Sequence, residues 1–293
     1  MKKRLLVFIL ISTYVLAGGV VVNKLELLEK KKPQKKKDIV STLLEEKELL
    51  IEKTIKRVDK EQKSQIELVN EEIQDIDGNS YKVVKIGDQY WMGENLKVTK
   101  YNDGSDIPLV TNKTIWASND ANDTNKPMMC WYENNEAKYK EVYGALYNWY
   151  AISTTTNENK NVCPVGWHVS SDEEWENLIK FVSKDKGVGN RGGEYVRSYE
   201  SDDWTEVGKY LKSKTGWEND KNGFDDYGFF GISGGKRHYD GSFKSFNMNG
   251  YWWCSTFTAI DNAWNRYLYY YNDNVNRNST RKDHGFSIRC VKN

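Results

Sequence analysis

The distribution of aromatic side chains divides this chain of 293 residues into two unlike parts. All 11 tryptophans lie between Trp91 and Trp264, whereas the first 80 residues contain none. Because aromatic side chains bury large apolar areas, only the C-terminal part can form a sizeable core. The net charge of +1, from 43 basic and 42 acidic side chains, gives no overall field that would attract nucleic acid. We therefore expect an aromatic-rich domain behind a charged N-terminal part, with no nucleic-acid partner.

An apolar segment at the start of the chain predicts export. Three basic residues precede residues 5–22, "LLVFILISTYVLAGGVVV", which carry no charge. This pattern fits a signal peptide, and its length also reaches the ~17–25 residues that span a bilayer as a helix. We expect residues 1–23 to be a signal peptide or a transmembrane anchor, so that the protein is secreted or membrane-anchored in the cell envelope. A cytoplasmic domain is the alternative, because residues 29–37 hold six lysines and basic residues then flank both ends.

Residues 24–74 are predicted to form a charged helical stalk or coiled coil. Between residues 38 and 73 there is no glycine or proline, and the good helix formers Glu, Lys and Leu are abundant. Apolar residues recur in a heptad pattern at Leu44, Ile51, Ile55 and Val58. At ~1.5 Å per residue such a helix would be roughly 50 Å long. The seam would allow a homodimer through the stalk, and a single solvated helix is the alternative.

From residue 75 onwards, short β-rich runs alternate with turns rich in Asn, Asp and Gly. The run "YKVVKIG" alternates as a strand does, and the turn signal Gly87-Asp88 leads into "QYWM", which predicts a hairpin. Helical patterns occur at residues 137–152 and 172–183. The second begins with a capping box formed by Ser171 and Glu174. Its acidic residues therefore have structural roles, and we assign none of them as a catalytic acid.

Seven motifs in sequence order resemble the Fibrobacter succinogenes major paralogous domain family. They cover residues 75–293 and include "DIDGNSYKVVKIGDQYWMGENLKVTKYNDG", "CPVGWHVSSDEEWENL", "NGFDDYGFFGISGGKRHYDGSF" and "KDHGFSIRCVKN". That family is similar to the formylglycine-generating-enzyme fold of sulfatase-modifying factors, itself a variant of the C-type lectin fold. The resemblance thus implies an α+β domain that is C-type-lectin-like, or sulfatase-modifying-factor-like, behind the stalk and the apolar helix. Members occur on exported proteins, which implies binding or adhesion.

Four cysteines, Cys130, Cys163, Cys254 and Cys290, favour disulfides in an exported chain, and four cysteines allow three pairings. The resemblance places the entrance of the second helix beside the last strand, which implies a Cys163–Cys290 bridge. Cys130 and Cys254 would then form the other. Close cysteine pairs of the kind that bind zinc are absent from the sequence. A catalytic dyad of Cys163 and His168 has no support beyond proximity in sequence.

Two other motifs bear on chemistry. "GISGG", residues 231–235, matches a nucleophile elbow with His284 as its base, but no helix pattern follows it, so a β-turn is expected. The triplets of calcium-dependent lectins are missing, and "AWNRY" places Arg266 where an aspartate would be needed. Calcium held by "YNDNVN" or "NDANDTN" is the remaining alternative, although such stretches are usually turns. We expect no cofactor, and the sequence leaves the metal content open.

The surplus of aromatic residues near the C-terminus is the remaining functional signal. Strand alternation sends about half of them to each face of a sheet, and exposed aromatics beside Asn and Arg suit a carbohydrate or protein ligand. The alternative is that they fill the core. We predict ligand-binding roles for Trp253, Trp264, Tyr269 and Tyr271. The expected function is a surface binding or adhesion module of the bacterial envelope without catalysis. An enzyme with an unlocated active site on the formylglycine-generating-enzyme-like fold is the alternative, and a spacer without a ligand is a third interpretation.

Overall fold

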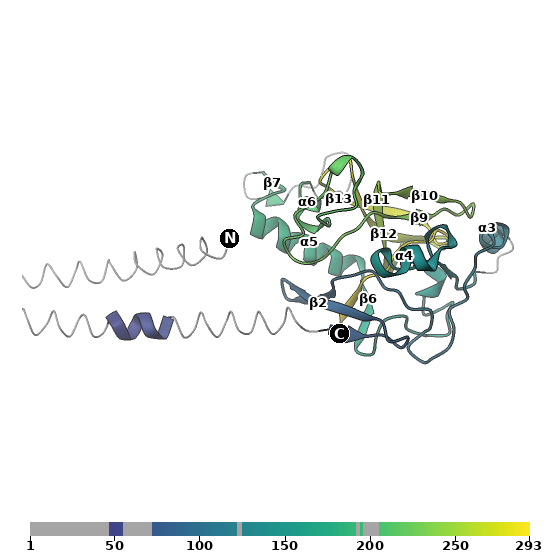
Figure 1. Ribbon diagram of the computed structural model, residues 1–293, viewed down its shortest axis with the longest axis horizontal. Helices are drawn as coiled ribbons and strands as arrows, with labels where there is room; N and C mark the ends of the chain where they lie inside the picture. Colours follow the sequence, from purple (N-terminus) through teal and green to yellow (C-terminus); the bar gives the residue numbers. More distant parts are fainter. Residues whose placement is uncertain (1–46, 55–71, 122–124, 192–193, 196–204) are drawn as a thin grey trace, which may run out of the picture. The chain divides into compact units, whose positions relative to one another are not determined.

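The structure describes separate stretches of the chain. This computed structural model describes residues 47–54, 72–121, 125–191, 194–195 and 205–293 (Figure 1). The chain divides into two compact units, residues 1–65 and 66–293. In the first unit, the described residues 47–54 are helical. The predicted signal peptide or anchor at residues 1–23 lies outside the described residues, as does most of the predicted stalk. Within the described stretches, no helix is long and apolar enough to span a membrane.

The first sheet of the second unit has five antiparallel strands in the order β1-β2-β3-β14-β6. These strands are β1 Glu72–Gln74, β2 Ser80–Ile86, β3 Gln89–Met92, β6 Trp167–Val169 and β14 Cys290–Lys292. The predicted hairpin is confirmed, since β2 pairs with β3 across the turn at Gly87-Asp88. The strand that comes last in the sequence, β14, lies between β3 and β6 in the interior of the sheet.

Strand β1 corrects the predicted end of the stalk. Residues 72–74 form a strand that pairs with β2, not the last turn of a helix. Asp75 fixes the turn that follows, because its carboxylate accepts hydrogen bonds from the backbone N–H groups of Asp77 and Asn79. Pairing with the next strand therefore overrides the helix-forming composition of the segment.

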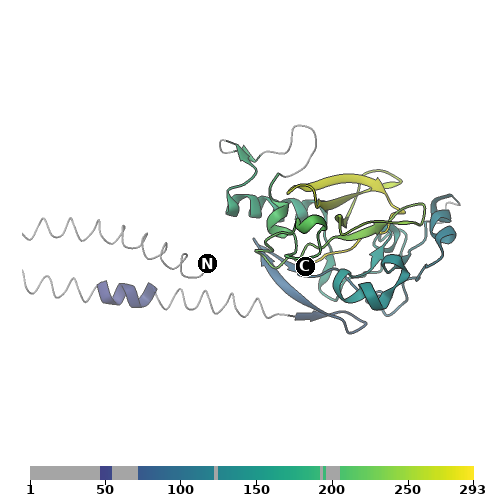
Figure 2. The ribbon, with the colours of Figure 1, turned by 45° about the horizontal axis from the view of Figure 1, so that its top comes forward.

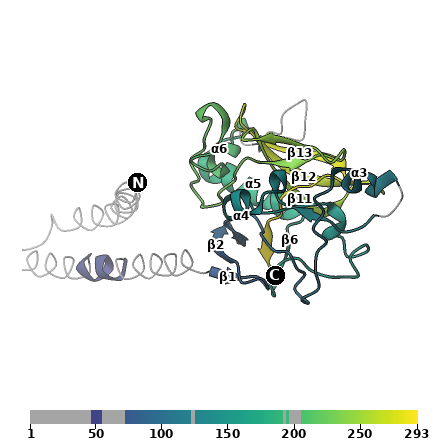
Figure 3. The ribbon, with the colours of Figure 1, turned by 45° about the vertical axis from the view of Figure 1, so that its right-hand side comes forward.

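The second sheet has the strand order β10-β9-β11-β12-β13. Its strands are β9 Gly234–Arg237, β10 Phe243–Phe246, β11 Asn249–Phe257, β12 Asn262–Tyr269 and β13 Val275–Arg281. Neighbours are antiparallel except for β9 and β11, which are parallel. Figures 1 and 3 show β11, β12 and β13 above β2 and β6. Figure 2 gives a further view, in which the yellow strands of the second sheet again lie away from the blue strands of the first.

Short elements surround the two sheets. The helices are α3 Lys113–Ala121, α4 Glu136–Tyr143, α5 Asp172–Lys186 and α6 Gly208–Leu211. The 3-10 turns are η1 Tyr132–Asn134, η2 Trp149–Ala151 and η3 Glu218–Asp220. The remaining strands form two small pairs, β4 Met129–Cys130 with β5 Leu146–Tyr147, and β7 Asn190–Arg191 with β8 Glu194–Tyr195. Helices and antiparallel strands are thus mixed in one α+β unit, as expected.

The first predicted helix ends earlier than the sequence pattern indicated. Instead of continuing to residue 152, α4 stops at Tyr143, and Gly144 follows with φ 72°. A Cβ atom on this glycine would lie 2.7 Å from the backbone oxygen of Leu96, so a close backbone contact fixes the turn. The chain then becomes extended, and β5 pairs with β4. The aromatic residues after Gly144 therefore reach the core from a strand and a 3-10 turn.

The second predicted helix is confirmed as α5. The side chains of Ser171 and Glu174 each accept a hydrogen bond from the other residue's backbone N–H, which is the predicted capping box. Gly187 ends the helix in the left-handed conformation. One side of α5 is buried through Trp175, Leu178, Ile179 and Val182. These residues share a core cluster with Trp252 and Leu268, so α5 covers one face of the second sheet.

Candidate functional site

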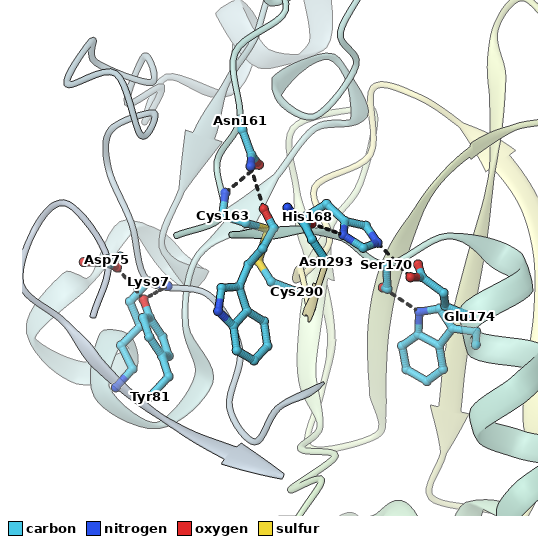
Figure 4. Close-up of a disulfide and its surroundings, with 12 residues drawn as sticks. Asp75, Tyr81, Lys97, Asn161, Cys163, His168, Ser170, Glu174, Cys290 and Asn293 are labelled. Carbon is cyan, nitrogen blue, oxygen red and sulfur yellow. Dashed lines mark hydrogen bonds and ion pairs between the residues drawn. A yellow bond between two sulfur atoms is a disulfide. The ribbon is translucent and has the colours of Figure 1, made fainter. Parts of the chain in front are cut away.

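A disulfide joins the segment before β6 to strand β14. Cys163 and Cys290 are bonded, with Cα atoms 6.0 Å apart, and they lie 127 positions apart in the sequence (Figure 4). Strand pairing brings them together, because β14 places Cys290 opposite Val169 of β6. The predicted Cys163–Cys290 bridge is confirmed. A bonded sulfur cannot act as a nucleophile, so this segment is scaffolding.

His168 is also part of this scaffold. Its Nε2 lies 2.7 Å from Glu174 Oε1, and its Nδ1 lies 2.6 Å from Asn293 Oδ1 (Figure 4). The other carboxylate oxygen of Glu174 accepts hydrogen bonds from the backbone N–H and the hydroxyl of Ser171. The histidine therefore ties β6 to the start of α5. Both of its ring nitrogens are engaged in these contacts, so neither activates a thiol as the dyad hypothesis would require.

The expected bridge between Cys130 and Cys254 is wrong, because both thiols are free and buried. They belong to different core clusters: Cys130 packs with Trp116 and Tyr139, and Cys254 with Trp175 of α5. Burial raises the pKa of Cys130 to about 11 and that of Cys254 to about 12. Both side chains therefore remain protonated thiols at neutral pH and are poor nucleophiles.

The residues of the other two candidate sites, the nucleophile elbow and the calcium turn, also make structural contacts. Ser233 is fully buried and donates its hydroxyl hydrogen to the backbone oxygen of Gly216, so it is not an exposed nucleophile. In the predicted calcium turn "YNDNVN", the ammonium of Lys212 donates to the backbone oxygen of Asn272 at 2.6 Å and lies 3.5 Å from the carboxylate of Asp273. The ammonium of Lys212 thus interacts with oxygens of this turn that a calcium ion would need as ligands. The second stretch, "NDANDTN", lies partly outside the described residues.

A buried ion network fastens α5 to the second sheet. Asp172 accepts hydrogen bonds from Arg266 Nη2 and Arg277 Nη2, both at 2.7 Å, and Arg266 also lies 3.2 Å from Glu176 Oε2. Arg266 is fully buried. Burial opposes ionisation of Asp172, but the two guanidinium groups outweigh it and hold the pKa of that carboxyl below its ordinary value. The arginine that stands where a lectin calcium ligand would be needed is therefore a structural ion-pair partner.

The four predicted ligand-binding aromatics do not form one site. Trp253 is fully buried and donates its Nε1–H to the backbone oxygen of Tyr147, so its predicted role is wrong. Trp264 lies on the opposite face of β12 from Tyr269, toward the core cluster of α5, with the Arg277 guanidinium 3.4 Å from its ring centroid. Tyr269 and Tyr271 do come together, with ring centroids 6.0 Å apart. Tyr271 is 74% exposed.

The second sheet has one open face, opposite to the face that α5 covers. It carries the partly exposed side chains of Lys236, Tyr251, Tyr267 and Tyr269, and the exposed Tyr271 follows just after β12. We call the surface formed by these five residues the tyrosine face. Strand register brings these side chains together. Tyr251 stands directly opposite Tyr267, and the residues just before Tyr251 in β11 and Lys236 in β9 pair with each other. The rings of Tyr251 and Tyr267 stack with centroids 5.5 Å apart, and Lys236 Nζ lies 4.8 Å from the Tyr251 centroid.

Only part of this sheet face is open. At the Trp253 end, the residues around Tyr147 and Trp149 cover it, and they share a core cluster with Trp253 and Ala263. At the other end Tyr251, Tyr267 and Tyr269 are partly exposed. Buried asparagines lie between the aromatic residues on the same face, at Asn249, Asn265 and Asn276. The open end is therefore a surface of aromatic rings and phenol hydroxyls, with the asparagine side chains buried between them.

The aromatic contacts continue from the tyrosine face to two histidines. Tyr251 stacks on buried Phe286 with centroids 4.9 Å apart, and His284 lies 5.5 Å from Phe286. The His284 ring meets the His238 ring edge-on at 4.9 Å. His284 is 5% exposed, and its Nδ1 is buried without a hydrogen-bond partner in the described part of the chain. Burial and then Lys236 lower its pKa to about 3, so the ring is neutral.

Part of this site could be recognised from the sequence. Alternation along β9 would place Lys236 and His238 on one face, because they are two positions apart. His284 could not be added from sequence, because it reaches the site through the contact of Gly285 with Arg237 of β9. Tyr251 and Tyr267 lay within the aromatic-rich runs, but the sequence does not reveal which end of the sheet is covered.

A family model described as Fibrobacter succinogenes major domain matches residues 84–292. The match spans well over half of the chain and includes both bonded cysteines and the whole tyrosine face. The chain belongs to the Fibrobacter succinogenes major domain family. No curated protein and no solved structure matches it significantly.

In this Fibrobacter succinogenes major domain the described titratable groups do not gather into a metal centre. Within the described stretches, no group of three or more His, Cys, Asp or Glu residues has the arrangement to hold a metal ion. The carboxylates near the histidines are already engaged: Asp240 accepts from Ser242 at 2.5 Å, and Asp283 pairs with Arg281 at 2.7 Å. The described groups exposed on the tyrosine face are therefore aromatic rings and the ammonium of Lys236.

His168 provides a pH test of the scaffold in this Fibrobacter succinogenes major domain. The hydrogen bond to Glu174 is the largest contribution that raises the pKa of His168 above its ordinary value. The stabilisation from this pair is therefore complete below about pH 6.5 and is lost as the pH rises through the folded-state pKa. Because the His168 side chain is 41% exposed, we expect less than about 1 kcal/mol. NMR titration should place the His168 midpoint above that of a Glu174→Gln variant, and equal midpoints would contradict the pairing.

Proposed function

We propose that this domain is a non-catalytic binding module of the bacterial cell envelope, and that it holds a polysaccharide on the tyrosine face. The observation that carries the proposal is an open sheet face with neighbouring tyrosines on two adjacent strands and a further tyrosine, Tyr271, that is 74% exposed. Aromatic side chains with one apolar face and one polar group are typical of interaction surfaces. Clustered on a rigid sheet, they need little ordering when a ligand binds.

The composition of the face favours a carbohydrate over a protein partner. Along β11, β12 and β13, the outward positions at the open end hold tyrosine and asparagine, and none holds leucine, isoleucine, valine or methionine. A protein hot spot usually buries an apolar anchor in a pocket. A sugar instead presents hydroxyls, which amides and phenols can pair with, and a C–H face that can rest on a ring. The side chains present match the second pattern.

The state of the candidate nucleophiles supports binding without catalysis. Cys163 is bonded to Cys290, while Cys130 and Cys254 are buried thiols with raised pKa values. Ser233 is buried against a backbone carbonyl. An enzymatic role, the alternative from sequence, would have to use other groups.

The setting of the domain is part of the same proposal. The Cys163–Cys290 disulfide supports export, since structural disulfides persist in oxidising compartments. Family membership and the α+β arrangement support a C-type-lectin-like fold of the sulfatase-modifying-factor type. On this view the N-terminal segment anchors or exports the chain, and the stalk carries the domain away from the membrane, with or without forming a homodimer.

Alanine substitutions on the tyrosine face test the proposal. We expect the full-length protein to bind at least one polysaccharide in a panel of neutral and acidic polymers, measured by affinity electrophoresis and calorimetry. Tyr271→Ala and Tyr267→Ala should each weaken binding about tenfold, the equivalent of ~1.4 kcal/mol for a central aromatic contact. Phe224→Ala is the matched control, because Phe224 is 54% exposed but lies in the loop after η3.

Two results would count against the proposal. One is equal binding by wild type, Tyr267→Ala and Tyr271→Ala, which would place the ligand elsewhere on the domain. The other is steady release of shorter sugars from a bound polymer, which would show that the domain is an enzyme. Thermal unfolding of each variant shows whether a loss of binding reflects a loss of fold.

A further inference from the structure

We propose that the ligand of the tyrosine face is an acidic polysaccharide, whose sugar rings carry carboxylates, and that Lys236 binds one of these carboxylates. This inference rests on the proposed function and specifies its substrate class. It is carried by the surroundings of Lys236 and by the aromatic surface next to it.

Lys236 and Arg237 of β9 have no carboxylate partner in the described part of the chain, but the guanidinium of Arg237 is fully buried and donates to backbone oxygens. Lys236 is partly buried, its Nζ lies over the ring of Tyr251, and no carboxylate in the described part of the chain is within salt-bridge distance. Its neighbours differ in this respect. Lys244, opposite Lys236 on β10, lies 3.3 Å from Asp240, and Arg281 lies 2.7 Å from Asp283. Because Arg237 is fully buried and Lys236 is partly exposed, Lys236 is the cation of this pair that a ligand on the tyrosine face can reach.

The histidines beside Lys236 do not compensate this charge. Burial and then Lys244 lower the pKa of Lys236, which means that its ammonium is partly desolvated beside a second cation. The neutral ring of His284, packed against His238 and Phe286, leaves its buried Nδ1 without a hydrogen-bond partner among the described residues. A polar atom that is buried and unpaired is costly for a folded protein. An incoming anionic group would compensate the charge of Lys236.

A carboxylate on a sugar ring fits the combination of groups. A partly desolvated ammonium attracts an anion more strongly than a fully solvated one, because the local dielectric screening is weaker. Lys236 stands in one row across the sheet with Tyr251 and Tyr267. A ligand held by the ammonium therefore also reaches the aromatic rings, which a sugar ring can cover. A free anion would use only the charge, and a neutral sugar would use only the rings.

The test compares one polymer with and without its charge. Full-length protein is titrated with polygalacturonic acid and with its methyl ester, which has the same backbone and no free carboxylates. We expect wild type to bind the acid about tenfold more tightly than the ester at low salt, with the preference lost in 1 M NaCl, where charge screening acts within ~3 Å. Lys236→Met should remove the preference, and Lys236→Arg should restore most of it.

Lys180→Met is the matched control, because Lys180 is exposed on α5, which packs against the opposite face of the sheet. Equal binding of acid and ester by wild type would overturn the carboxylate assignment while leaving the proposed function intact. A preference that survives Lys236→Met in a folded variant would overturn the role of Lys236. Tighter binding of dextran sulfate than of polygalacturonic acid would assign the site to sulfate instead. If no acidic polymer binds, this inference fails, and the neutral polymers of the panel then decide the proposed function separately.

Discussion

Removal of the Cys163–Cys290 disulfide is expected to destabilise the domain by about 4–5 kcal/mol. The bond closes a loop of 127 residues, and in the chain-entropy model a loop of that length restricts the unfolded state by about this amount. Urea unfolding followed by tryptophan fluorescence should show the loss in a Cys163→Ser/Cys290→Ser variant, and in wild type after reduction. A marginally stable domain would have little stability left after such a change.

Thiol counting provides the control for this prediction. Alkylation of the unfolded, unreduced protein should label two cysteines, Cys130 and Cys254, and prior reduction should raise the number to four. Cys130→Ala removes a buried thiol without opening the long loop, so it should cost far less than breaking the disulfide. If four thiols react in the unreduced protein as isolated from its native compartment, the bond is absent there, and the argument for export loses its support.

Replacing Asp172 by Asn is expected to cost about 3 kcal/mol. The substitution removes the negative charge that Arg266 and Arg277 share, and the fully buried Arg266 then retains, among the described residues, only Glu176 as an anionic partner. Breaking one side of a buried ion pair is costly because it leaves a charge uncompensated in a medium of low dielectric constant. Glu173→Gln is the matched control, since Glu173 lies in the same first turn of α5 and is exposed.

The pH dependence of this effect has a definite sign. The pKa of Asp172 is lower in the folded than in the unfolded protein, where it is about 3.9. The stabilisation is therefore present above about pH 4 and is lost as the pH falls through the folded-state pKa. The difference in unfolding free energy between wild type and Asp172→Asn should shrink toward zero in strong acid. A difference that stays constant down to pH 2 would mean that charge is not its cause.

The parts of the fold that local sequence determines could be predicted. The capping box at Ser171 and Glu174 lies within four residues, and the apolar repeat of α5 follows it directly. The hairpin of β2 and β3 depends on its own turn and on strand alternation. The disulfide needed more, since only the resemblance to a family placed its two segments side by side. Each of these features could be predicted either from the spacing of nearby residues or from the resemblance to a family.

The predictions that were wrong have a common physical cause, which is contact between segments that are distant in the sequence. The turn at Gly144 is fixed by the backbone of Leu96, 48 positions earlier, so the local helix pattern could not reveal it. Tyr251 and Trp253 lie on the same face of β11 by alternation, yet one is partly exposed and the other is buried beneath the segment around Tyr147. Whether an aromatic residue is exposed or fills the core thus depends on which loop crosses the sheet.

The interior position of β14 in the first sheet has a consequence for biosynthesis. A chain made from its N-terminus exposes β3 and β6 to the surroundings long before residues 290–292 exist to join them. Until then Cys163 has no native partner, and the sheet is split into two incomplete pieces. This domain cannot mature progressively during synthesis, because its closing strand and its covalent lock arrive together. The native sheet can therefore form only after the last residues of the chain have been made.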